Sequence, residues 1–109
     1  MKFKTAVGNI VQVPVKLSLR DGMVDKPFSF TLTATRKTQE EIEETPELSV
    51  KDFLLDVVSD WHGQRPVLLD NDEPAPFSRE ALDYMLKIPG VLGVVWVAYQ
   101  KHTASKEKN

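Results

Sequence analysis

A strict alternation of apolar and polar residues near the N-terminus constrains the fold more than any other feature of this sequence. Apolar side chains occupy every second position from Val11 to Leu19. A period of two is that of a strand with one buried face. Pro14 lies on the outward-facing set, and because proline cannot donate to a strand ladder, it predicts an edge strand or a bulge. A second run, Phe28 to Thr35, alternates in the same way and is rich in residues that favour strands.

Turn residues separate and precede these two runs. Asp21-Gly22 indicates a turn, and we expect a connection that reaches to Pro27 and is longer than a minimal hairpin. A shorter third strand is expected ahead of Gly8-Asn9, with alternating Phe3, Thr5 and Val7. Residues 1–36 are therefore predicted to form an antiparallel β-meander with one apolar face. A sheet this small needs a covering layer.

An apolar stripe at helical spacing supplies that layer. Ser49 is a typical N-cap, and Asp52 three residues later completes a pattern like a capping box. The stripe that follows consists of Val50, Phe53, Leu54, Val57, Val58 and Trp61. Gly63 and Pro66 are stop signals, so the helix is predicted to run through Trp61, with His62 at its C-terminus. We expect Trp61 in the core, where its indole N–H needs an acceptor.

The C-terminal half contains one clear helix and one ambiguous segment. Residues 64–76 predict a loop, and Ser78 caps a helix that ends before Pro89-Gly90. The segment from Val91 to Tyr99 fits both a buried strand, by its β-branched content, and one face of a helix. If it is helical, Leu92 and Trp96 are expected on an exposed apolar side that suits a protein partner.

The predicted fold class is α+β, with a small N-terminal antiparallel β-meander packed against two or three C-terminal α-helices. A chain of 109 residues suits a single domain. We place it at residues 1–102, divided into the meander (1–36), an acidic linker (37–48) and a helical part (49–102). Residues 103–109 are predicted to form a disordered tail.

The formal net charge of -2 arises by cancellation between segments. Residues 1–38 hold 7 Lys/Arg against 2 Asp/Glu, residues 39–73 hold 2 against 11, and residues 74–109 hold 5 against 3. The overall balance argues against a nucleic-acid-binding protein, which is usually basic. The polarised charge favours protein partners, including a self-association that salt weakens. No membrane partner is expected, because the longest apolar run is far too short to span a bilayer.

No residue pattern predicts catalysis, a cofactor or a metal. With 0 Cys the sequence has no thiolate nucleophile and no cysteine-based zinc site. The carboxylates between Asp70 and Glu73 lack the spacing of a calcium loop and are interpreted as a solvated turn. His62 and His102 alone are a thin basis for zinc. The sequence has neither a Gly-x-Ser-x-Gly motif nor a glycine-rich phosphate loop, so we expect a protein that is not an enzyme.

The order of several short motifs resembles that of the tail assembly chaperones of long-tailed phages and prophages. The resemblance covers most of residues 10–109. The matching positions after Val13-Pro14-Val15 are Asp60, Trp61, Gly63, Phe77, Ser78, Pro89, Ala98, Tyr99, Lys108 and Asn109. The sequence departs from the family pattern at Ile88, where an aromatic residue is expected, and at Lys106, where arginine is more usual.

The resemblance implies a chaperone of the bacterial host cytoplasm that is absent from the mature virion. Such proteins bind the tape-measure protein and help to recruit tail-tube subunits, often through a frameshifted form with a C-terminal extension. An adenine run, on which ribosomes slip, can encode Lys108-Asn109. The resemblance also favours a helix for residues 91–101, with Leu92, Trp96 and Tyr99 as candidate contacts for a tape-measure helix. The alternative is a structural tail or head–tail joining subunit that is retained in the virion.

Overall fold

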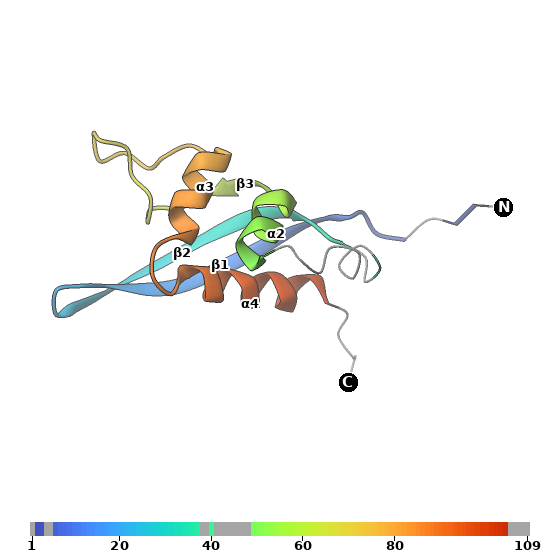
Figure 1. The fold of residues 1–109 in the computed structure, drawn as a ribbon, viewed down its shortest axis with the longest axis horizontal. Coiled ribbons are helices and arrows are strands. Elements are labelled where there is room, and N and C mark those ends of the chain that lie inside the picture. The colour runs from blue at the N-terminus through green and yellow to red at the C-terminus, as the bar shows by residue number, and fades with distance from the viewer. Residues whose placement is uncertain (1, 4–5, 38–39, 41–48, 105–109) are drawn as a thin grey trace.

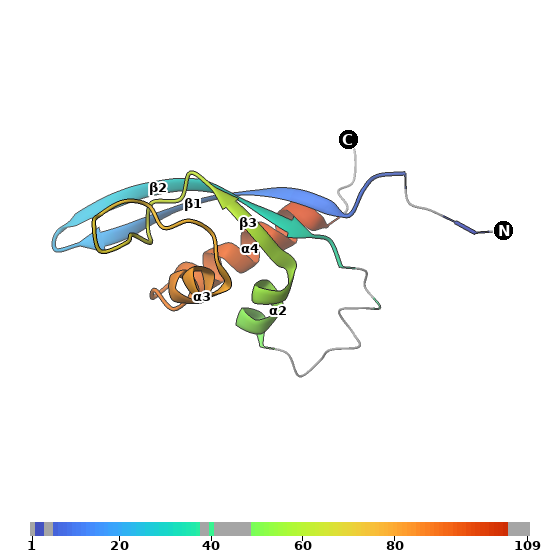
Figure 2. The same ribbon diagram turned by 90° about the horizontal axis from the view of Figure 1, so that it is seen from above.

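The computed structural model describes residues 2–3, 6–37, 40 and 49–104, and it has an α+β fold. A three-stranded antiparallel sheet has the order β1-β2-β3, and the described helices lie on one face of it (Figures 1 and 2). The elements in chain order are β1 (Ile10–Asp21), β2 (Val24–Thr35), α2 (Val50–Val57), β3 (Val58–His62), α3 (Arg79–Leu86) and α4 (Val91–Thr103). The predicted fold class is confirmed.

The two predicted strands form one long hairpin, with their alternating apolar residues turned towards the helices. Val13 pairs with Leu32 and Val15 with Phe30, and all four side chains are buried. Pro14 lies in β1, which is an edge strand of the sheet, as its position in the alternation predicted.

The connection between the strands is shorter than expected. Asp21 pairs with Val24, so the turn consists of Gly22 and Met23, and Gly22 supplies the positive φ of 63° that such turns require. The expectation of a longer loop reaching to Pro27 is wrong. Hydrogen bonds alternate along an antiparallel pair, and the bond from Arg36 N to Asn9 O fixes their phase. The nitrogen of Pro27 therefore faces away from β1, where a missing N–H costs no ladder bond.

The third strand comes from a different part of the chain than expected. The described residues before Ile10 form no strand, and Phe3 is 92% exposed, so the predicted strand around it is wrong; Thr5 lies outside the described residues. The third strand is β3, which pairs with Thr31–Ala34 of β2.

This strand replaces the last turn of the predicted helix, because α2 ends at Val57. The pairing of Ala34 with Val58 and of Thr33 with Asp60 leaves Ser59 as the extra residue of a β-bulge. The bulge puts Val58 and Trp61 on the same buried side, although they are three residues apart. Spacing by three also fits a helical face, which is why the sequence predicted a helix through Trp61.

Both predicted helix caps are confirmed. Ser49 Oγ accepts a hydrogen bond from Asp52 N at 3.1 Å and donates one to Asp52 Oδ2 at 2.9 Å. At the start of α3, Ser78 Oγ accepts from Ala81 N at 3.0 Å. The helix then buries Leu82, Met85 and Leu86 against the core, the face that its apolar spacing predicted.

The ambiguous segment is the helix α4, which buries Val91, Val95 and Tyr99. It extends to Thr103, which was predicted to belong to the tail and whose Oγ1 donates to Tyr99 O at 2.7 Å. Among the described residues no single helix is long and apolar enough to cross a bilayer; α3 and α4 meet the length and composition criteria only as a pair bent by 110°. Most of the predicted acidic linker and residues 105–109, including Lys108 and Asn109, lie outside the described residues.

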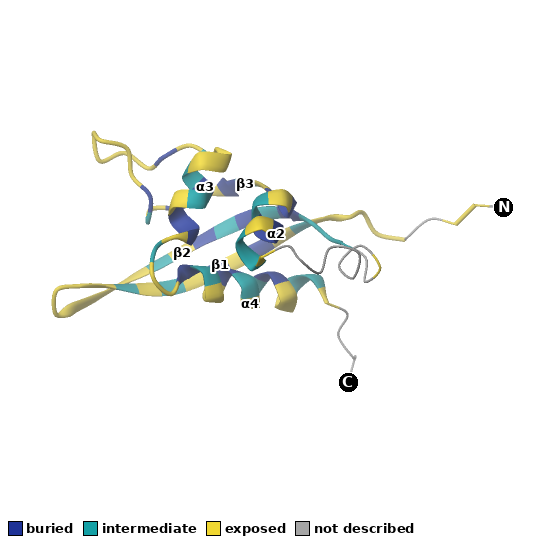
Figure 3. Ribbon diagram, in the orientation of Figure 1, coloured by how far each residue is buried: buried dark blue, intermediate teal, exposed yellow. Residues whose placement is uncertain are grey.

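The core lies between the sheet and the helices, where the buried positions gather (Figure 3). The end of the hairpin around Gly22 and the turn at 70–73 are exposed.

Candidate functional site

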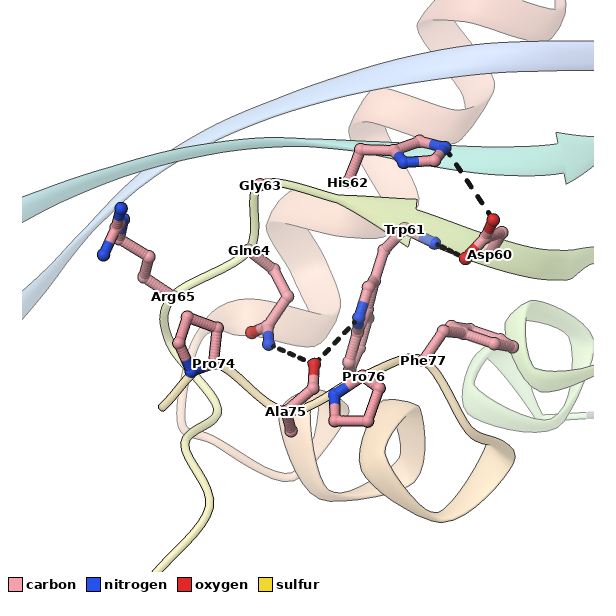
Figure 4. Close-up of a pocket in the computed structure, with 10 residues that line it drawn as sticks. All are labelled: Asp60, Trp61, His62, Gly63, Gln64, Arg65, Pro74, Ala75, Pro76 and Phe77. Atoms are coloured by element: carbon pink, nitrogen blue, oxygen red, sulfur yellow. Dashed lines mark hydrogen bonds and ion pairs between the residues drawn. The ribbon is translucent and has the colours of Figure 1, made fainter. Parts of the chain in front are cut away.

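Four of the motif positions, Asp60, Trp61, Gly63 and Phe77, line one groove beside β3 (Figure 4). Trp61 is only 6% exposed, and its Nε1 donates to Ala75 O at 3.2 Å, which confirms the predicted core position and supplies the acceptor. The ring of Phe77 meets that of Trp61 edge to face at 5.3 Å. Asp60 Oδ1 accepts from Trp61 N at 2.8 Å, and Gly63 follows β3 at the same groove. These contacts fix the position of β3 relative to the segment that leads into α3.

Gln64 is a buried polar residue that no sequence pattern singles out. It is 3% exposed, and its Nε2 donates to both Val67 O and Ala75 O at 2.9 Å. Its Oε1 accepts from Val67 N at 3.0 Å. The amide therefore ties both ends of the 67–75 loop to the segment that follows β3, and we assign this groove a structural role (Figure 4). A glutamine within a predicted loop carries no periodic signal that could have revealed this.

The expected free apolar side of α4 does not form as predicted. Trp96 stacks on Tyr99 at 5.9 Å and meets Phe53 of α2 edge to face at 5.5 Å. Tyr99 is 4% exposed, and its hydroxyl donates to Thr35 O at 3.0 Å. Leu92 is half-buried. Because Trp96 packs against the ring of Phe53 in α2, its side chain is partly buried. The expectation of an exposed apolar side of the helix that includes Leu92 and Trp96 is therefore wrong.

The remaining motif positions connect and anchor elements of the fold. Ser78 caps α3, and Pro89 lies in the connection between α3 and α4. Ala98 is half-buried on α4 beside Tyr99. Lys108 and Asn109 cannot be placed because they lie outside the described residues.

An open, largely apolar surface lies between α3 and the 67–76 loop, and we call it the α3 groove. Its volume is about 340 Å³, and it is lined by Val67, Leu68, Leu69, Ala75, Pro76, Ser78, Glu80, Ala81 and Tyr84. Leu68 is 49% exposed, Leu69 45% and Tyr84 64%. Three large apolar side chains thus face solvent at one place.

Main-chain bonds hold the loop that forms one wall of the α3 groove. Leu68 bridges to Pro74, and Leu69 N donates to Glu73 O at 2.8 Å. This closes the exposed turn that carries Asp70 and Asp72. The groove was not predicted because residues 64–76 have the composition of an ordinary loop; the two consecutive leucines inside this polar segment were the available signal.

The charged groups near these surfaces do not gather into a metal site. Within the described ranges, no group of three or more His, Asp or Glu side chains is close enough to hold an ion. His62 Nε2 lies 3.8 Å from Asp60 Oδ2, and both side chains are more than half exposed. No family model, curated protein or solved structure matches the chain. Function must therefore be inferred from its residues and their geometry.

Proposed function

We propose that this protein is a non-enzymatic tail assembly chaperone of the phage type, acting in the bacterial cytoplasm. In this proposal the α3 groove binds an apolar helix of the tape-measure protein. The observation that carries the proposal is the joint exposure of Leu68, Leu69 and Tyr84 along one open groove. Contiguous exposed apolar surface of this kind is typical of protein-binding sites.

The shape and lining of the α3 groove support a helical client. The lining of the groove combines small or buried residues (Val67, Ala75 and Ala81) with the exposed apolar side chains of Leu68, Leu69 and Tyr84. An amphipathic helix presents side chains at positions i, i+3 and i+4, which such a groove accommodates. A volume of about 340 Å³ is near the lower end for binding pockets. We therefore expect it to take two or three side chains of the client.

Residues of the motif order also help to hold the walls of the α3 groove in position. Trp61 Nε1 and Gln64 Nε2 both donate to the carbonyl of Ala75, and Gln64 also holds Val67. Ala75 and Val67 line the α3 groove, and Ser78, which caps α3, lines it as well. Preorganised walls lower the cost of ordering on binding. This supports a link between the phage-like motif and the proposed binding surface.

The charge at the α3 groove favours a client with basic flanks. Glu80 is the charged residue of the lining, and it forms no ion pair with a described residue. The turn that extends from Leu69 carries Asp70, Asp72 and Glu73, all exposed. Complementary charge contributes mainly to orientation and association rate. We expect lysine or arginine beside the apolar stripe of the bound helix.

A binding assay with the tape-measure protein encoded beside this one tests the proposal. Leu69→Asp is expected to weaken binding by at least about tenfold, since it places a charge among apolar contacts. The matched control is Val24→Asp, which changes an apolar residue that is 60% exposed at the end of the hairpin. If Leu69→Asp stays folded and binds as tightly as the parent, the α3 groove is not the client site.

Two further observations test the biological part of the proposal. Mass spectrometry of purified virions should not detect a chaperone, whereas a structural tail or joining subunit would be found in the particle. The proposed recruitment of tail-tube subunits by an extended form requires a slippery adenine run at the codons of Lys108 and Asn109, followed by an overlapping reading frame. A gene without either feature would contradict that part.

A further inference from the structure

A second open groove lies between β1 and α4, and we call it the β1 groove. Its volume is about 450 Å³, and it is lined by Pro14, Lys16, Val94, Val97, Ala98, Lys101 and His102. It shares no lining residue with the α3 groove. In Figure 1 the helix α4 lies on one side of the long axis of the hairpin and α3 on the other.

The β1 groove is open because β1 is the edge of the sheet. Asn9 O accepts from Arg36 N, so by the alternation of the ladder the odd-numbered residues of β1 bond to β2. The main-chain groups of Pro14 and Lys16 therefore face outward. Across from them, α4 buries Val91 and Val95 and leaves Val97 62% exposed.

The lysines of this groove differ from most others in the described chain. Lys26, Lys37, Lys51 and Lys87 each lie within ion-pair distance of an aspartate. Lys16 and Lys101 form no ion pair with any residue that the structure describes, and both line the β1 groove. Lys16 comes from the strand and Lys101 from the helix, so two cations that have no ion-pair partner among the described residues lie on opposite walls of a groove that is otherwise largely apolar.

We infer that the β1 groove binds an acidic amphipathic segment of a protein partner. Apolar side chains of this segment would contact Val94, Val97 and Ala98, and its carboxylates would pair with Lys16 and Lys101. Pro14 lacks the N–H that an added strand would use at this edge, which favours a helix as the occupant. This inference is independent of the α3 groove and of the tape-measure protein.

Two designed fluorescent peptides test it by anisotropy. Both carry the same leucine stripe at helical spacing, one with glutamate and the other with lysine on its flanks. The assay uses the Leu69→Asp protein, in which the α3 groove is disabled, so that only the β1 groove is compared. The glutamate peptide is expected to bind about tenfold more tightly than the lysine peptide at low salt.

Substitutions in the β1 groove locate the binding. Lys16→Glu combined with Lys101→Glu should weaken the glutamate peptide by about tenfold and strengthen the lysine peptide. Val97→Asp should weaken both peptides. All three positions are exposed, so the variants are expected to keep the circular dichroism spectrum of the parent. Equal binding of the two peptides, or binding unchanged by the lysine substitutions, would overturn the inference.

Sedimentation velocity of the protein alone distinguishes a partner from a second copy. A monomer that binds the glutamate peptide supports a separate acidic partner. A dimer that the glutamate peptide dissociates, and that Lys101→Glu also dissociates, would show that another copy occupies the groove and would overturn the assignment to a separate protein.

Discussion

Trp61 joins β3 to the 67–76 loop through a single indole hydrogen bond. Trp61→Phe keeps an aromatic ring but removes the donor to Ala75 O and leaves a cavity in the core. We expect the free energy of unfolding to fall by about 1–3 kcal/mol. Trp96→Phe is the matched control, because Trp96 is half-buried and forms no hydrogen bond with a described residue. Urea denaturation followed by circular dichroism measures both variants; equal losses would contradict the role given to the indole N–H.

Asp83 of α3 forms ion pairs with two lysines, Lys51 of α2 and Lys87 at the C-terminal end of α3. Lys87 Nζ lies 2.9 Å and Lys51 Nζ 3.1 Å from its carboxylate oxygens, and hydrogen bonds from Lys87 and then Lys51 hold the pKa of this carboxyl below its ordinary value of 3.8. A carboxyl whose pKa is lower in the folded state stabilises the fold above its unfolded pKa. That stabilisation is lost as the pH falls through the folded pKa.

The parent should therefore melt at a higher temperature than Asp83→Asn at neutral pH, with a gap that shrinks below about pH 4. Thermal unfolding across a pH series measures this gap. The double variant Lys51→Met, Lys87→Met removes the partners instead of the carboxylate, and it should lose the same pH-dependent stabilisation. A gap between the parent and Asp83→Asn that does not change with pH would rule out the ion pairs as its source.

At the level of the elements, substitutions of two glycines, one before α4 and one inside it, are expected to change the stability of the protein in opposite directions. Gly90 precedes the helix with φ 86°, a conformation that costs a residue with Cβ about 1 kcal/mol. Gly93 lies inside the helix, and a Cβ there meets nothing within 4 Å. Gly90→Ala is thus expected to destabilise the protein by about 1 kcal/mol and Gly93→Ala to stabilise it by about 0.5–1 kcal/mol. Chemical denaturation of the two variants should show shifts of opposite sign.

The elements that the sequence predicted correctly are those whose signals are local. Period two along β1 and the serine caps of α2 and α3 depend on neighbours within a few residues, and the structure has them where expected. The strand β3 was missed because its buried residues, Val58 and Trp61, are three apart. Only the bulge opposite Thr33 and Ala34 makes that spacing fit a strand, and a bulge depends on the partner strand.

The candidate surfaces were harder to predict than the elements for the same reason. Trp96 is exposed or buried according to whether Phe53 of another helix lies beside it, which the pattern of α4 alone does not contain. The α3 groove needs a loop and a helix that are adjacent only in the fold. The segmental charge pattern was visible in the sequence, but the association of copies that it implied, with its weakening by salt, stays a prediction.

At the scale of the whole molecule, the two proposed binding grooves together predict that one molecule binds a basic and an acidic partner at the same time. They share no lining residue, and α3 and α4, which cover the same face of the sheet, lie on either side of the long axis of the hairpin in Figure 1. Sites without shared residues or contacts are expected to act nearly additively. One molecule should then hold both designed peptides at once.

This prediction is tested by labelling the two peptides with different fluorophores and titrating one in the presence of the other. With the parent protein, a saturating amount of the lysine peptide should change the Kd of the glutamate peptide by less than about twofold, because independent sites have no coupling free energy. Competition between the peptides would show that they share one surface and that the two grooves are not separate sites.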